Sequence, residues 1–560
     1  MARGMRSGVK YVCPANTAPS RDLRRAVFDR LHAGTAVADR ERQRSLEDGL
    51  LPATVQVRYA RTCLHWVERR RENLNGSCIY ARLSKMGILD RHFGFDEHDT
   101  DLETETIAGL TTFLAMSYII VVNPLILGEA ITIDGYSQGE VQQMIAVATI
   151  LASVVAIGVM AFWANRPFGL APGMGLNAFF AFTVVLGLGV PWEVALAAVF
   201  VEGVIFILLT AVGARRYVIE LFPEPVKFAV GAGIGLFLLF LGLQEMEIVV
   251  ADPATLVAMG NVATSPVAAL SLAGLALMLM LHARGVRGSI VIGILATAAA
   301  GWLLTLFGIT SPGTLTPPGS YEQVTQDGLA NMIANVQYDF TPLVAGFVDG
   351  LGMITEDPLV FVIVVFTFFF VDFFDTAGTL IGVSQVGGFL DEEGDLPEIE
   401  KPLMADAVGT TVGAMIGTST VTTYIESSTG VEEGGRTGFT ALVVGTLFLL
   451  SLLIVPVISA IPQYATYVAL VVVGIIMLRG VADIDWQNPA WAIAGGLTIT
   501  VMPLTASISN GLAAGIVSYP LVKAATGEPR DVSLGQWALA LAFVVYFAIY
   551  FTVEAGNVTF

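Results

Sequence analysis

The sequence predicts an all-α polytopic membrane protein, and three observations carry this prediction. Hydrophobic residues make up 54% of the 560 positions, charged residues only 14%, and the mean hydropathy is +0.71. Apolar stretches long enough to cross a bilayer recur from about residue 106 to residue 551. One stretch in each half of the chain is interrupted by residues that do not favour a helix. The sequence contains no soluble domain of any size.

The N-terminal stretch 1–85 differs in composition from the remainder. It holds 17 Lys and Arg against 8 Asp and Glu, whereas acids dominate elsewhere. The three cysteines, Cys13, Cys63 and Cys78, all lie there at spacings that match no zinc pattern. The stretch lacks the long apolar core of a signal peptide. We expect residues 1–85 to be either a disordered cytoplasmic tail or a translated upstream extension, with Met86 as the natural start.

Residues 100–310 are expected to form a first repeat of seven segments. Its third segment, 168–187, is dense in Gly and Pro at its start, so a helix would break near Pro172. Because Gly173 and Gly175 have no side chain, a ligand or another backbone could approach closely there. The other six segments are expected at about 106–127, 141–163, 192–213, 225–243, 266–282 and 288–308.

Residues 311–357 are expected to form an acidic extracellular loop, since the stretch is rich in acids and has no Lys or Arg. Residues 358–551 are expected to form the second repeat. Because an odd number of segments precedes it, this repeat would be inverted relative to the first. The scarce basic residues place the N-terminus in the cytoplasm. The stretch 489–525 crosses once or twice, which gives fourteen or fifteen crossings. The other segments are expected at about 359–383, 403–417, 418–434, 437–460, 464–478 and 535–551.

The second interrupted segment, 416–438, is the strongest candidate for a site. Six of the eight residues from Thr418 to Ile425 are β-branched, which favours extended backbone over helix. Glu426 follows at once. Non-helical backbone at membrane depth requires protein or a watery cavity around it, and an acid in the membrane is by default a functional residue. Interrupted segments at corresponding positions of two halves indicate a transporter site.

Two further groups of residues join this candidate site. Asp372 and Asp375 lie one helical turn apart in an apolar segment. Asn177 and Phe179 follow the break of the first half. Acids on different segments suit a proton-coupled site, because each can be neutral or charged according to what occupies the cavity. The alternatives are that an acid braces a neighbouring helix, and that Phe179 and Tyr424 are ordinary packing residues.

Four stretches resemble signatures of the nucleobase:cation symporter-2 (xanthine/uracil permease) family. They are GLTTFLAMSYIIVVNP (109–124), APGMGLNAFFAF (171–182), FDTAGTLIG (374–382) and GTSTVTTYIESSTGVEEGGRTG (417–438). The resemblance covers about residues 100–551 and is closest to the AzgA-like branch of adenine, guanine and hypoxanthine permeases. Uracil and xanthine members often carry a Gln-His pair in the first helix, where this chain has Thr111 and Thr112.

The resemblance implies about 14 transmembrane segments in a 7+7 inverted repeat, with a core domain, a gate domain and a short strand in each of segments 3 and 10. It also implies that Asp375 and Glu426 bind the base. A carboxylate can accept two hydrogen bonds from adjacent N–H groups such as those of guanine. The full candidate substrate-binding set is Asp375, Glu426, Asn177, Phe179, Tyr424, Thr423 and Gly175, of which Asp375 and Glu426 are also the candidates for proton coupling.

The expected function is import of purine nucleobases (hypoxanthine, guanine or adenine) by proton symport, with alternating access, across the plasma membrane. We expect no enzymatic activity, metal, cofactor or nucleic acid. An anion transporter of the sulfate or bicarbonate type with the same architecture and a cation channel are the alternatives. The sequence leaves open which purine is preferred, whether H⁺ or Na⁺ is the coupling ion, and whether the protein forms a homodimer.

Overall fold

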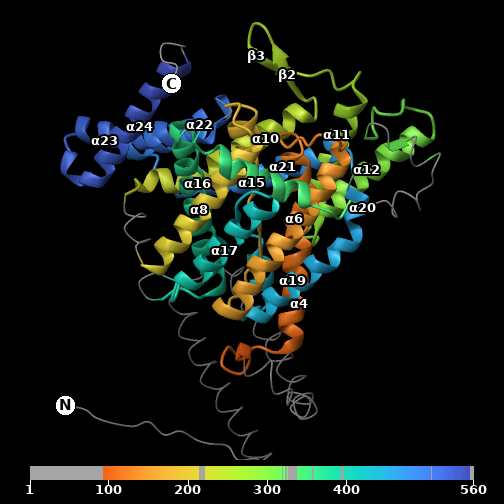
Figure 1. Ribbon diagram of the computed structural model, residues 1–560, viewed down its shortest axis with the longest axis horizontal. Coiled ribbons are helices and arrows are strands. Elements are labelled where there is room, and N and C mark those ends of the chain that lie inside the picture. The colour runs from red at the N-terminus through yellow and green to blue at the C-terminus, as the bar shows by residue number, and fades with distance from the viewer. Residues whose placement is uncertain are drawn as a thin grey trace, which may run out of the picture. The chain divides into compact units, whose positions relative to one another are not determined.

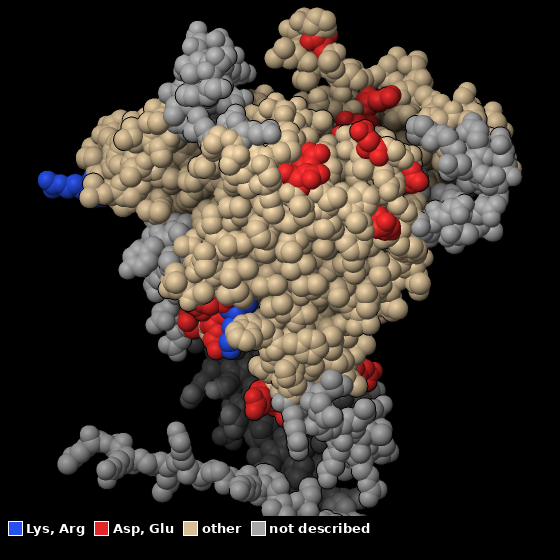
Figure 2. Space-filling model, viewed as in Figure 1, with Lys and Arg blue, Asp and Glu red and all other residues tan. Residues whose placement is uncertain are grey.

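The computed structural model describes residues 92–213, 221–317, 320–321, 325, 337–355, 358–391, 396–458, 460–505 and 507–554. The basic stretch 1–85, for which we expected a tail or an upstream extension, lies outside the described residues. Among these residues, eight helices are long and apolar enough to cross a bilayer. In Figure 2 the charged side chains of the face shown lie toward its upper and lower ends, with uncharged surface between them. The predicted class, a mostly helical multi-pass membrane protein, is confirmed.

The first half contains two interruptions of the helical pattern, one within the first segment and one in the third. The elements in order are α4 (Leu102–Met116), α5 (Ile119–Leu127), α6 (Gln138–Val159), the π-helical turn η1 (Met160–Ala164), β1 (Leu170–Pro172), α7 (Met174–Ala178), the π-helical η2 (Phe179–Val185), α8 (Trp192–Ala211), α10 (Glu224–Glu245), β2 (Val249–Asp252), β3 (Leu256–Met259), α11 (Pro266–Ala283) and α12 (Ser289–Leu306). The hairpin of β2 and β3 was not expected from the sequence.

In the described part of the second half, one strand lies among the helices. The elements in order are α15 (Thr341–Met353), α16 (Pro358–Gly387), α17 (Glu400–Ile416), β4 (Val421–Thr423), α18 (Ser427–Glu432), α19 (Gly438–Leu450), η3 (Ser451–Ile454), α20 (Val455–Ile458), α21 (Gln463–Met477), η4 (Leu478–Asp483), α22 (Pro489–Leu504), α23 (Ile508–Ala525), η5 (Pro529–Asp531) and α24 (Leu534–Glu554). Helix α15 thus lies within the stretch expected to be an acidic loop. The stretch 489–525 forms two helices.

Strands β1 and β4 pair with each other, although about 250 residues separate them in the chain. They are antiparallel, with Leu170 opposite Thr423 and Pro172 opposite Val421. Each is three residues long and fully buried. Their pairing satisfies backbone groups that could find no water at membrane depth. The two short strands implied for the third and tenth segments are therefore present.

The helices around the strand pair pack closely. Helix α17 lies against both α6 and α8 (Figure 1). At Gly203 on α8, an added Cβ would lie 2.9 Å from the backbone nitrogen of Thr411 on α17, so only glycine allows this approach. A second set forms where α10 packs on α21, α22 and α23. The strand pair belongs to the first set of helices. Helix α10 of the second set contacts α7, the short helix that follows β1.

Candidate functional site

The backbone hydrogen bonds of the strand pair extend one residue beyond each strand. Gly173 donates its N–H to the Thr420 carbonyl at 3.0 Å, and Tyr424 donates to the Gly169 carbonyl at 3.0 Å. Each strand is followed by a short helix, α7 after β1 and α18 after β4. Two helix N-termini therefore begin beside the same buried ladder.

Asp375 lies at the start of α7, although it belongs to α16. Its side chain is half-buried. An added Cβ at Gly173 would lie 3.5 Å from Asp375 Oδ2 and 2.8 Å from Cγ2 of Thr422. The glycine noted in the sequence thus leaves room for the methyl group of Thr422, and the Asp375 carboxyl lies in ordinary contact distance of the same position.

Glu426 is the N-cap residue of α18 and is also half-buried. Tyr118, between α4 and α5, donates its hydroxyl to Glu426 Oε1 at 2.8 Å. The rings of Tyr118 and Tyr424 are 6.4 Å apart, and the Tyr424 hydroxyl donates to the Pro172 carbonyl at 2.6 Å. Asp375 is close enough to Glu426 for the charge of the Glu426 carboxylate to act on it. The structure therefore brings Asp375, Glu426 and Tyr424 together.

Asn177 and Thr423 hold the scaffold of the strand pair. The side-chain oxygen of Asn177 accepts from the Ser419 hydroxyl, and its amide donates to the Pro172 carbonyl at 3.4 Å. The Thr423 hydroxyl donates to Asp406 on α17 at 2.9 Å. In this conformation the polar atoms of both side chains bond to protein, so they position the strands.

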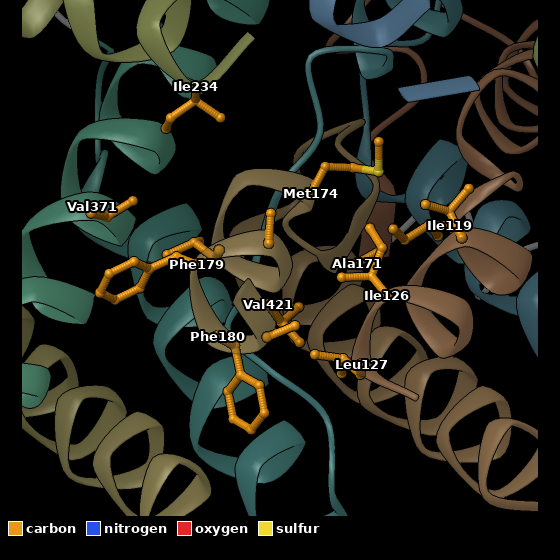
Figure 3. Close-up of a cluster of buried hydrophobic side chains, with 14 of the residues drawn as sticks. Ile119, Ile126, Leu127, Ala171, Met174, Phe179, Phe180, Ile234, Val371 and Val421 are labelled. Carbon is orange, nitrogen blue, oxygen red and sulfur yellow. The ribbon is translucent and has the colours of Figure 1, made fainter. Parts of the chain in front are cut away.

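Phe179 and Gly175 also contact protein. Phe179 is 1% exposed and meets Phe368 of α16 edge to face, with ring centroids 4.8 Å apart. Figure 3 shows Phe179 directed toward the helix of Val371, within the apolar cluster around the strands. A Cβ at Gly175 would lie 2.6 Å from Cγ2 of Ile234 on α10. The close approach at Gly175 is therefore to another helix.

The side chains of the 420–424 stretch alternate between two sides, as an extended chain requires. Thr423 bonds to Asp406, and Val421 packs against Gly409, so these two face α17. The alternate residues Thr420 and Thr422 face α8 and α16. This alternation places the Thr422 and Tyr424 side chains on the side where Asp375 and Tyr118 lie.

Sequence reasoning missed Tyr118 and Asn123, both from the first segment. The Asn123 amide donates to Thr149 on α6 at 2.7 Å and to Thr418, just before β4, at 2.9 Å. One pattern in the sequence points to these residues: a serine, a tyrosine, an asparagine and a proline interrupt the apolar run 109–124. Their partners lie on other segments, so the signal did not reveal their roles.

A model described as "Permease family" matches residues 103–514. A putative permease of Methanocaldococcus jannaschii is 44% identical over 82% of this chain and 98% of its own length. Adenine permease AdeP of Escherichia coli is 38% identical over 83% of this chain and 97% of its own length. Guanine/hypoxanthine permease PbuO of Bacillus subtilis is 41% identical over 82% and 99%.

Among solved structures, the transmembrane domain of the cyanobacterium bicarbonate transporter BicA is similar at 14% identity. The TM-score is 0.46, over 74% of this chain and 97% of that chain.

Proposed function

The chain belongs to the Permease family, a family of transporters and not of enzymes, and on that basis we propose that it imports purine nucleobases by proton symport with alternating access. This is the nucleobase:cation symporter-2 family that the sequence motifs indicated. The named relatives are adenine and guanine/hypoxanthine permeases, in agreement with the AzgA-like branch.

The observation that carries the proposal is the meeting of two carboxylates from different segments of the second half of the chain. Asp375 and Glu426 lie beside the paired strands, with Tyr118 bonded to Glu426 at 2.8 Å. A carboxylate there can accept two hydrogen bonds from the ring N–H and amino group of guanine, and hypoxanthine keeps the ring N–H. Tyr118 and Tyr424 are the aromatic side chains beside these carboxylates; both are buried in this conformation, so a base would stack on them only after the site opens.

We further propose that the membrane part has 14 transmembrane segments in two inverted repeats, 100–310 and 358–551, with residues 311–357 outside the cell. The helices around the strand pair form the core domain, and α10 with α21 to α23 contributes to the gate domain. Gly175 on α7 packs against Ile234 on α10, so this contact lies where the two domains would slide. The plasma membrane is the expected location, with the N-terminus in the cytoplasm.

The relatives' names favour a purine over an anion as cargo. Two acids at the centre of the site would also repel a dianion. The interrupted segments, paired across the two halves, favour alternating access over a permanently open channel.

Uptake of radiolabelled hypoxanthine, guanine, adenine, xanthine and uracil tests the proposal. Cells that express the chain are assayed with and without a protonophore, and with and without sodium. Saturable purine uptake that collapses with the proton gradient is the expected result. A correctly inserted protein that takes up none of the bases would refute the proposed cargo, and purine uptake that follows sodium alone would refute proton coupling.

A further inference from the structure

Two other acids meet in the interior, apart from Asp375 and Glu426. Glu202 lies on α8 and Asp372 on α16, and their side chains are 0% and 1% exposed. Glu202 is nine or ten residues from either end of its helix, which is about 15 Å at the helical rise. The carboxyls of Glu202 and Asp372 lie within hydrogen-bonding reach of each other. A buried acid pair therefore sits near the middle of two long helices.

The Glu202 carboxyl has fewer donors than an ionised carboxylate needs in the interior. Thr420 donates its hydroxyl to Glu202 Oε2 at 3.3 Å, and Thr376 donates to Asp372 Oδ1 at 3.1 Å. The other oxygen of Glu202, Oε1, is buried and has no donor among the described residues. Two adjacent carboxylates repel each other and cannot donate to each other, so the contact between Glu202 and Asp372 is favourable only if one of them carries a proton.

Among the described residues, no cation acts on the Glu202 carboxyl. Helix α8 packs against α15, α16, α17 and η2. The acids on those helices near the strands are the buried Asp372 and the half-buried Asp375 on α16, and the buried Asp406 on α17, which is bonded to Thr423. Of the charged groups of the described chain, Asp372 is the one that acts on the Glu202 carboxyl. An isolated pair of charges in this interior would be expensive.

Hydroxyl groups connect the pair to the strand that borders the site. Thr376 bonds to both Asp372 and the Thr422 hydroxyl, the latter at 2.8 Å. Thr420, the residue directly before β4, bonds to Glu202. A displacement of β4 relative to α8 and α16 would therefore change the hydrogen bonds of both acids. A base bound beside Asp375 and Glu426 can in this way influence a proton held by Glu202 and Asp372.

We propose that Glu202 and Asp372 together form a proton-binding site whose proton is translocated with the base, additional to any proton exchanged at Asp375 and Glu426. On release, the O–H bond of the protonated carboxyl breaks, its electron pair stays on the carboxylate, and the proton passes to water. Binding is the reverse. The inference rests on the proposed proton symport and assigns part of its coupling to a site that does not contact the base.

Stoichiometry measurements test this proposal. Proton influx and radiolabelled guanine uptake are recorded together in proteoliposomes for wild type, Glu202→Gln, Asp372→Asn and the control Glu193→Gln, which changes an acid near the start of α8. We expect both pair variants to move one proton fewer per base, while Glu193→Gln keeps the wild-type ratio. Since each coupled proton is worth about a tenfold accumulation per pH unit of gradient, the accumulation ratio should fall by about that factor.

An unchanged proton-to-base ratio in both pair variants would overturn the inference and leave proton symport intact. Wild-type uptake that ignores the proton gradient would overturn both. Sodium-driven uptake that disappears in Glu202→Gln would mean that the pair binds sodium, and it would overturn the proton site.

If neither pair variant inserts into the membrane, infrared spectroscopy of the Asp375→Asn, Glu426→Gln double variant tests whether the pair carries a proton. This variant keeps the pair intact. A protonated-carboxyl band at neutral pH is expected, and its absence would overturn the inference.

Discussion

Replacing Glu426 by glutamine should weaken guanine transport more than hypoxanthine transport. Glutamine keeps one acceptor oxygen but replaces the other with an NH₂ group, which faces a donor of the base. A hydrogen bond to a charged group contributes about 1.5–3 kcal/mol. Guanine offers two adjacent donors and would lose one such bond, so its affinity should fall by roughly 10- to 150-fold. Hypoxanthine lacks the amino group and should lose less.

The assay is competition between each unlabelled base and radiolabelled adenine or guanine, whichever the variant still transports, which gives an inhibition constant for every base. Glu432→Gln is the matched control, because Glu432 lies on the same helix α18 and is exposed. The Tyr118 hydroxyl can still donate to the glutamine oxygen, so the local fold should persist. Equal affinities of wild type and Glu426→Gln for both bases would refute the role assigned to this carboxylate.

Three further predictions concern separate parts of the molecule. Gly173→Ala should strongly reduce uptake at normal surface expression, because the new Cβ would lie 2.8 Å from Thr422 Cγ2; wild-type uptake would show that the strand pair can yield. Glu105 is fully buried and accepts hydrogen bonds from backbone N–H groups at the start of α19, including that of Thr440 at 3.1 Å. Glu105→Gln should therefore lower the free energy of unfolding by about 1–3 kcal/mol, and an unchanged melting temperature in detergent would contradict this. Burial raises the pKa of Glu129, in the loop between α5 and α6, so its ionisation opposes folding as pH rises through that pKa. Glu129→Gln should gain thermal stability relative to wild type between acidic and neutral pH, and a pH-independent difference would contradict the assignment.

The sequence was sufficient to predict the interrupted segments and the two acids beside them. The β-branched run before Glu426 specified an extended backbone, and the glycines after Pro172 specified a close approach. The partners of these groups could not be predicted, because they depend on which helices meet. Gly175 admits Ile234 of α10, and Thr423 bonds to Asp406, although no local pattern connects either pair.

The Glu202–Asp372 pair shows the same limit. Asp372 was recognised as an acid in an apolar segment, with bracing of a neighbouring helix as the alternative. Glu202 lies in a separate apolar segment, and sequence spacing cannot show that two segments bring their acids together. Tertiary packing decides which intramembrane acids become neighbours, and so which of them share a proton.

The alternating directions of the 420–424 side chains also restrict how this protein can change during evolution. Insertion or deletion of one residue in that stretch would turn every following side chain to the opposite side. Tyr424 would then face α17, and Thr423 would leave Asp406 for the side of Asp375. Altered base preference is therefore expected to arise by replacement of side chains at fixed length, whereas the loops that join the helices are free to vary in length.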